Sequence, residues 1–384
     1  MPYISKPRVI WVRAFWTGKS FKFAQKAFLY PLLALLPAII MSGCSTAPLM
    51  RYTTETQPAV MVPVSQAGIR DERGRFREIF CAVLAKRGAA LPDERPCEEA
   101  LVHVGAESAG TGRPIELGPS RRRLIAAVVP GVGWDCFSDW LDLKQSVAGH
   151  LRQFGYDQIT LEVDGLSSSA NNARQLRSAI MQPAFDSDEP RLVLIGYSKG
   201  APDILEALVS YPEIQARIAA VVSVAGAIGG SPLANDATQS QLALLQHWPG
   251  ARCPPGDGGA IESLRPETRK AWLAQHALPP GIPYYSLVTF PQPERISSIL
   301  RSSYKKLSRV DARNDSQVLF YDQLVPGGAL LGYLNADHWA LAVPIARSHT
   351  MLGSTLVEHN DYPREALLEA ILRMVEKDLA AAEK

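Results

Sequence analysis

The sequence is poor in cysteine, and it has no apolar run of the roughly 20 residues that comfortably span a bilayer. Its five cysteines include no Cys-x-x-Cys spacing and have no histidine cluster beside them, so we expect neither a metal site nor a cofactor. No internal repeat is visible. With 47% apolar and 20% charged residues, the composition excludes collagen-like, coiled-coil and fully disordered chains. A length of 384 residues allows two or three domains, or one elaborated α/β domain.

Acidic residues are absent from the first 43 positions, which carry six of the 40 lysines and arginines. Removing these six leaves 34 basic residues against 38 acidic ones, a net charge of −4 instead of the +2 of the whole chain. The remainder is therefore mildly acidic, and we expect no nucleic-acid partner.

The N-terminus has the organisation of an export signal. Its basic stretch precedes a 15-residue apolar run, Ala27–Met41, which is short for a bilayer span and contains two prolines. The run ends in Met41-Ser42-Gly43-Cys44-Ser45, which resembles a bacterial lipobox with Met where Leu is usual. The resemblance implies removal of residues 1–43, acylation of Cys44 and attachment to a membrane through that lipid, favouring the outer membrane where one exists. An uncleaved anchor and an ordinary signal peptide are the alternatives.

Export permits disulfides between the four cysteines that remain: Cys81, Cys97, Cys136 and Cys253. Three pairings are possible. Cys81 and Cys97 are closest in sequence and connect two candidate helices, so the sequence favours Cys81–Cys97, with Cys136–Cys253 as the remaining pair.

Two segments lie between the signal and the main domain. Residues 44–70 contain scattered prolines and are interpreted as a flexible tether. Residues 71–120 form a helical N-terminal extension, in which apolar side chains at helical spacing between Phe76 and Leu84 predict one helix and Glu98–Val104 a second. Neither helix shows chemistry, and we expect both to pack against the domain that follows.

Residues 121–382 alternate strands and helices, which predicts a mainly parallel central sheet with helices on both faces. The expected strands are Leu124–Val129, Ile159–Val163, Leu192–Ile195, Ile218–Val224 and Tyr284–Phe290. A closing helix begins at Pro363. The interval between the last two strands, about residues 231–282, is long for a crossover and is interpreted as a lid over the site, with an inert surface insertion as the alternative.

A Gly-x-Ser-x-Gly motif, Gly196-Tyr197-Ser198-Lys199-Gly200, follows the buried strand Leu192–Ile195 and precedes a helix. In a sharp strand–turn–helix turn the serine hydroxyl is lifted clear of the sheet, and the glycines allow close packing. Ser198 is therefore the candidate nucleophile.

A serine nucleophile needs a base to accept its proton and an acid to orient that base. His338, in a loop after an apolar run and before the terminal helix, is the candidate base. The acid is expected between the nucleophile and the base. Asn314-Asp315-Ser316-Gln317-Val318 resembles the Asn-Asp-Gly-x-Val loop of lipases and esterases, with Ser316 in place of Gly, and favours Asp315. Asp322 and Glu294 remain the alternatives.

Two backbone N–H groups are expected to bind the oxyanion. Lys199 follows the nucleophile, and Val132 lies in Pro130-Gly131-Val132-Gly133-Trp134, which resembles the His-Gly-x-Gly loop of lipases with Pro130 in place of His. Taken together, residues 121–382 resemble an α/β-hydrolase of the lipase and esterase kind. The resemblance implies the α/β-hydrolase fold and hydrolysis of carboxylic esters, with a hydrophobic ester as substrate. An acyltransferase using the same triad and a non-catalytic binding protein of the cell envelope are the alternatives.

Overall fold

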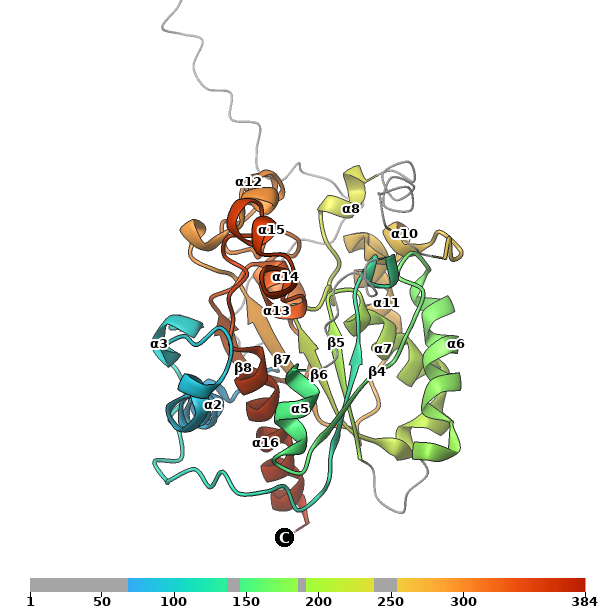
Figure 1. Ribbon diagram of the computed structural model, residues 1–384. Helices are drawn as coiled ribbons and strands as arrows, with labels where there is room; N and C mark the ends of the chain where they lie inside the picture. The colour runs from blue at the N-terminus through green and yellow to red at the C-terminus, as the bar shows by residue number, and fades with distance from the viewer. Residues whose placement is uncertain (1–67, 137–145, 186–190, 238–253, 384) are drawn as a thin grey trace, which may run out of the picture. The chain divides into compact units, whose positions relative to one another are not determined.

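A central β-sheet runs through the part of the chain that the computed structural model describes, residues 68–136, 146–185, 191–237 and 254–383 (Figure 1). Its strand order is β1-β8-β7-β6-β5-β3-β4, and β2 also pairs with β8. All pairings are parallel except β2 with β8. The prediction of a mainly parallel sheet is therefore confirmed.

The strands are β1 (Arg70–Asp71), β2 (Leu101–Val102), β3 (Ile125–Val129), β4 (Asp157–Thr160), β5 (Leu192–Tyr197), β6 (Ile218–Val224), β7 (Tyr284–Thr289) and β8 (Ala329–Leu334). The helices that cover the sheet are α2 (Arg73–Arg87), α5 (Ser146–Arg152), α6 (Ser169–Ile180), α7 (Gly200–Ser210), α11 (Pro266–Gln275) and α16 (Arg364–Ala382). Short helices include α3 (Cys97–Ala100), α8 (Leu233–Asp236), α10 (Ala260–Leu264), α12 (Arg301–Leu307), α13 (His338–Ala342), α14 (Ile345–Ser348) and α15 (Thr350–Thr355).

The central strands are apolar throughout because both faces of the sheet are buried. In β5, Val193 and Ile195 face the core formed with α2, α5 and α16, whereas Leu192 and Leu194 face the core formed with α6, α7 and α11. Figure 1 shows these two groups of helices on opposite sides of the strands. The arrangement leaves the carboxyl ends of the strands free to carry loops.

The N-terminal extension completes one edge of the sheet. Strands β1 and β2 pair in turn with β8, at Ala329–Leu330 and at Tyr333–Leu334. Helix α2 packs Phe76 and Phe80 into the same core as α16. The predicted second helix, Glu98–Val104, is wrong beyond Ala100, because Leu101 and Val102 find unpaired backbone groups on β8 and form a strand with them.

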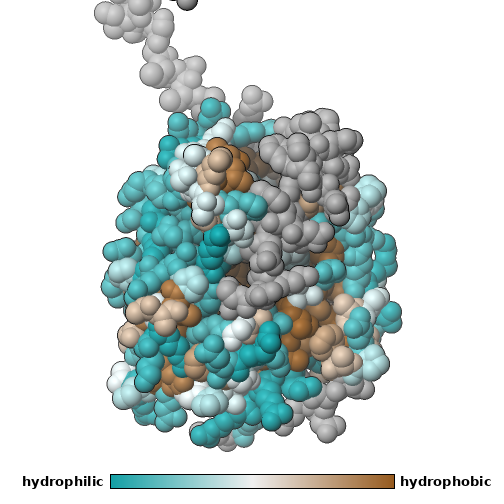
Figure 2. Space-filling model, viewed as in Figure 1, coloured by the Kyte–Doolittle hydropathy of each residue, from teal (hydrophilic) through white to brown (hydrophobic). Residues whose placement is uncertain are grey.

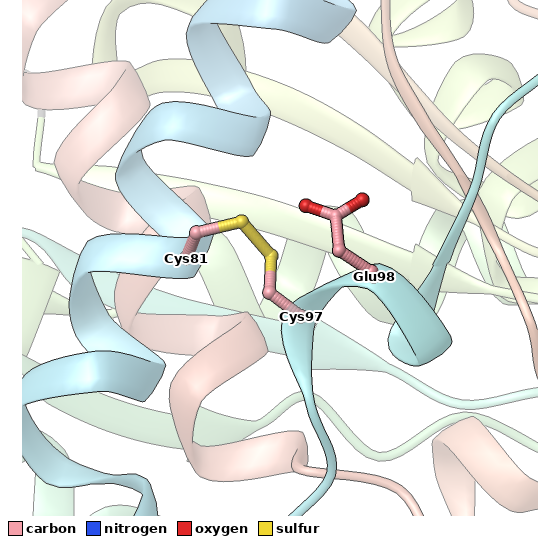
Figure 3. Close-up of side chains that lie close together, drawn as sticks. All are labelled: Cys81, Cys97 and Glu98. Atoms are coloured by element: carbon pink, nitrogen blue, oxygen red, sulfur yellow. A yellow bond between two sulfur atoms is a disulfide. The ribbon is translucent and has the colours of Figure 1, made fainter.

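A disulfide joins Cys81 on α2 to Cys97 at the start of α3, with Cα atoms 5.2 Å apart (Figure 3). The exposed carboxylate of Glu98 lies beside it. Because both sulfurs are in the disulfide, they are not thiolates able to bind a metal ion. Cys136 is also disulfide-bonded, and its expected partner Cys253 lies outside the described residues.

None of the helices in the described ranges combines the length and the hydropathy required to cross a bilayer. The expected signal peptide, the lipidated Cys44 and residues 44–67 of the tether lie outside these ranges.

Candidate active site

Ser198 occupies a sharp turn between β5 and α7. Its φ is +54°, a left-handed conformation that is strained for a residue with a side chain. The turn is tight because α7 begins against the loop that follows β3: a Cβ on Gly200 would lie 2.1 Å from the carbonyl oxygen of Val129. Glycine is therefore required at this position, and the half-buried Ser198 hydroxyl stands at the carboxyl end of the sheet.

Three side chains far apart in sequence form a hydrogen-bonded row. His338 Nε2 lies 2.9 Å from Ser198 Oγ, and His338 Nδ1 lies 2.7 Å from Asp315 Oδ2. His338 is the first residue of α13, and Asp315 is fully buried in the loop before β8. Since an ionised carboxylate only accepts, Nδ1 donates to Asp315 and leaves Nε2 as the acceptor for the serine hydroxyl.

The surroundings of Asp315 fix its orientation. Its Oδ1 accepts hydrogen bonds from the backbone N–H groups of Gln317 and Val318, at 2.9 and 2.8 Å. Its Oδ2 also accepts from the hydroxyl of Thr289, at 2.6 Å. The carboxylate is thus held in place by its own turn and by the end of β7. The turn contains Ser316 with a φ of +83°, a left-handed conformation that favours glycine, the residue found at this position in the loop that the sequence resembles.

The imidazole of His338 is held from the other side by Tyr197. The Tyr197 hydroxyl donates to the carbonyl oxygen of His338, and the two rings lie 5.1 Å apart between centroids. Burial raises the pKa of the Tyr197 hydroxyl well above its ordinary value, and the nearby carboxylates of Asp315 and Asp337 raise it further. Tyr197 therefore stays neutral and serves as a donor. Neither contact was foreseen from the sequence.

The alternative acids lie elsewhere. Glu294 is exposed in the short 3₁₀ helix Pro293–Arg295. Asp322 is buried on the 3₁₀ helix Phe320–Gln323, where its carboxylate faces Gly229. Asp337 caps α13, accepting from the N–H groups of Trp339 and Ala340. Of the described acidic residues, the structure brings Asp315 to the imidazole.

Asp322 makes stability depend on pH. Burial raises the pKa of its carboxyl from 3.8 to about 7, which the charge of Lys270 opposes only in part. The folded state therefore binds this proton more tightly than the unfolded state does. The resulting contribution to the free energy of unfolding is fully present below pH 4 and is lost as the pH rises to about 7. We expect Asp322→Asn to increase the free energy of unfolding at pH 8 by up to about 4 kcal/mol and to change it little at pH 4.

Urea unfolding at the two pH values measures this effect. Ester hydrolysis by the Asp322→Asn variant is expected to match the wild type, because Asp322 contacts none of Ser198, His338 and Asp315. An equal stability change at both pH values would contradict the assignment of a neutral, buried carboxyl.

The two predicted oxyanion donors are placed by different elements. Lys199 is the residue before α7, and Val132 lies in the loop after β3. A Cβ on Gly131 would lie 2.7 Å from Ser198 Cβ, so this loop lies too close to Ser198 for any side chain at position 131. Among the described residues, the backbone hydrogen bonds of the fold use neither the N–H of Val132 nor that of Lys199. Both donors remain free for a ligand.

A largely apolar cavity of about 750 Å³ opens over Ser198 and His338. It is lined by residues of the loop after β3, of α8 and α10, and of segments 299–318 and 338–357. The lining side chains that are apolar include Val132, Trp134, Leu233, Ile261, Leu264, Ile299, Val343, Leu352, Leu356 and Val357. The site is thus suited to an apolar ligand with one polar, reactive group.

The structure describes the predicted lid, residues 231–282, only in part, because residues 238–253 lie outside the described ranges. Helices α8 and α10 of the 231–282 interval do line the cavity, but α11 packs Trp272 and Leu273 against the sheet. Ile299 and several residues of 343–357 also line the cavity. The N–H of Ile299 donates a hydrogen bond to the carbonyl oxygen of Leu356 (3.1 Å), which joins the two segments. Ile299 and Leu356 are exposed at this end of the molecule, where Figure 2 shows an apolar patch.

No family model matches the chain, and no curated protein matches it in sequence. A solved structure does: the metagenomic carboxyl esterase MGS0156 shares 43% identity with it, over 84% of this chain and 97% of that one, with a TM-score of 0.77. The chain belongs to this family of carboxyl esterases. The esterase is also similar to Staphylococcus hyicus lipase, at 13% identity over 70% of this chain and 99% of that one, with a TM-score of 0.50.

The second comparison concerns the fold alone, whereas the first also identifies the reaction. Together they confirm the prediction of an α/β-hydrolase-like fold with ester hydrolase activity. The esterase is thus a carboxylic ester hydrolase.

Proposed function

We propose that the esterase cleaves hydrophobic carboxylic esters through an acyl-enzyme on Ser198, with His338 as the base and Asp315 as the acid that orients it. The observation that carries the proposal is the hydrogen-bonded row from Ser198 Oγ through both nitrogens of His338 to the buried Asp315. A hydroxyl hydrogen-bonded to a neutral imidazole nitrogen is the arrangement that activates serine for attack.

Acylation begins when Ser198 Oγ attacks the ester carbonyl carbon and its proton passes to His338 Nε2. The tetrahedral oxyanion accepts hydrogen bonds from the N–H groups of Val132 and Lys199. His338 then protonates the leaving alkoxide, which departs as the alcohol. In deacylation a water molecule attacks the acyl-enzyme while His338 accepts its proton, and the carboxylic acid leaves as the proton returns to Ser198 Oγ.

A fluorophosphonate probe tests the nucleophile. We expect Ser198 Oγ to displace fluoride from phosphorus, which adds the phosphonyl group to the tryptic peptide containing Ser198 and to no other. Ser198→Ala should abolish labelling, and Ser178→Ala, a surface serine on α6, should not change it. Labelling that persists in Ser198→Ala, or that is absent from folded wild-type protein, would overturn the proposal.

The substrate class follows from the cavity. Its lining is mainly apolar and its volume of about 750 Å³ is large enough for an acyl chain of several carbons. With p-nitrophenyl esters of graded length, we expect kcat/KM to rise from acetate to a chain of medium length, because each methylene buried in the cavity contributes about 0.8 kcal/mol. A steady decrease from acetate onward would exclude the apolar cavity as the acyl site.

We further propose that the esterase is a lipoprotein of the cell envelope, held to a membrane by acyl chains on Cys44. The support is the basic stretch, the apolar run and the cysteine that ends it. Cells that produce the full chain and are fed radiolabelled palmitate should incorporate label into the wild type and not into Cys44→Ser. Equal labelling of both proteins would contradict the proposal.

A further inference from the structure

Directly beneath the nucleophile lies a buried ion pair that takes no part in the triad. The ammonium group of Lys199 is 2.8 Å from each carboxylate oxygen of Asp203, one turn further along α7. The two residues are 1% and 0% exposed. Asp203 Oδ2 also accepts a hydrogen bond from the side-chain amide of Asn172 on α6, at 2.7 Å.

A contribution to the stability of the fold does not explain why this ion pair is present. Removing two charges from water costs several kcal/mol per ion, and apolar residues of similar size are often as stable or more so in such positions. Instead, the pair fixes the orientation of the long Lys199 side chain, because its ammonium group bonds to both carboxylate oxygens of Asp203. Asp203 N also donates to the carbonyl oxygen of Lys199, at 3.2 Å, so the residue is tied at its backbone and at its side chain.

The residue held in this way carries one of the two free N–H groups beside Ser198. Its surroundings allow little adjustment, since Gly200 touches the backbone of the loop that carries Val132. Rotation of the Lys199 peptide would therefore turn one oxyanion donor away from the other. Misplacement of a catalytic group by about 1 Å can reduce a rate 10²-fold.

We propose that Asp203 is a positioning residue, which holds the Lys199 side chain so that the Lys199 backbone N–H points at the oxyanion. This inference rests on the proposed role of Ser198. Asn172 serves the same purpose, because it orients the carboxylate of Asp203 from a neighbouring helix. The pair thus links the accuracy of the oxyanion site to the contact between α6 and α7.

The test separates positioning from stability with a double variant. Asp203→Asn leaves a buried lysine charge without its counterion, and we expect a lower melting temperature and a kcat about 10- to 100-fold lower. In Lys199→Met/Asp203→Asn the lysine charge is removed together with its counterion. The double variant then lacks only the attraction between Asp203 and the buried Arg269, so the melting temperature should recover in part. The kcat should remain about 10- to 100-fold low with KM within twofold, because the oxyanion donor acts in the transition state.

A trifluoromethyl ketone provides a second measurement. Its adduct with Ser198 carries an oxyanion, so its inhibition constant should rise in the double variant by the same factor as kcat/KM falls. The concentration of active sites is measured by titration with the fluorophosphonate. The inhibition constant and kcat/KM are calculated from that concentration, so they do not depend on the folded fraction. Wild-type kcat and inhibition constant in the double variant would show that the pair is only structural.

Glu369→Gln is the matched control. Glu369 is buried and pairs with Arg373, also four residues apart on α16, and in addition with Arg87 and His150, and it contacts no residue of the site. We expect a lower melting temperature with wild-type kcat per active site. If the wild type is not labelled at Ser198, the proposed nucleophile is wrong; if it is labelled and the double variant is fully active, only the positioning role is wrong.

Discussion

Replacing Ser198 by alanine is expected to lower kcat for p-nitrophenyl ester hydrolysis by about 10⁴- to 10⁶-fold. The loss is large because the variant has no oxygen with which to form the acyl-enzyme, and the base at His338 then acts on nothing but water. Some acceleration over the uncatalysed reaction should remain, since the oxyanion donors and the cavity are unchanged.

The fold should tolerate this change. Ser198 Oγ is half-buried and its hydrogen bond goes to His338, so we expect the melting temperature to change little. The comparison needs the same purification for both proteins, because a trace of contaminating esterase would hide the loss. If Ser198→Ala kept more than a few per cent of the wild-type kcat in that comparison, another group would have to be the nucleophile.

The second large effect is expected for Asp315→Asn, with kcat about 10⁴-fold lower. Asp315 is surrounded by donors: the ring of His338, the hydroxyl of Thr289 and two backbone N–H groups. An asparagine has one accepting oxygen, so its NH₂ group must face some of these donors. When the NH₂ faces His338, Nδ1 becomes the acceptor and Nε2 carries the proton, which prevents it from taking the proton of Ser198.

Asp322→Asn is the control for this experiment, since it removes a second buried carboxylate from the same loop region without touching His338. We expect its kcat to equal that of the wild type within twofold. Fluorophosphonate labelling should slow in Asp315→Asn to a similar extent as turnover, because both reactions need the activated hydroxyl. Comparable losses in the two asparagine variants would mean that Asp315 has no special role as the acid.

Much of the catalytic end of the molecule was predictable because its signals are local. The apolar strand before Ser198 and the glycines around it specify a strand–turn–helix turn from a few neighbouring residues. The chain order of nucleophile, acid and base restricted the candidates further. The position of His338 after an apolar run, which forms β8, placed it at the same edge of the sheet as Ser198.

Other features had no local signal. The extension showed helical spacing, yet Leu101–Val102 became a strand because the edge of β8 offered unpaired backbone groups. The resemblance of residues 314–318 to a lipase loop favoured Asp315, but the chain order left Asp322 and Glu294 as alternatives, since both also precede the base. The packing of the loop against Thr289 and the imidazole is what places Asp315, and neither alternative, at His338.

By itself, then, the sequence determined the parallel sheet and the sharp turn that carries the serine, because hydrophobic runs and glycines act over short distances. The tertiary structure alone decided which carboxylate meets the imidazole, which segments close the cavity and that Lys199 is held by Asp203 from beneath. These depend on contacts between residues that the chain brings together only when the sheet has formed, and no pattern along the chain records such distances.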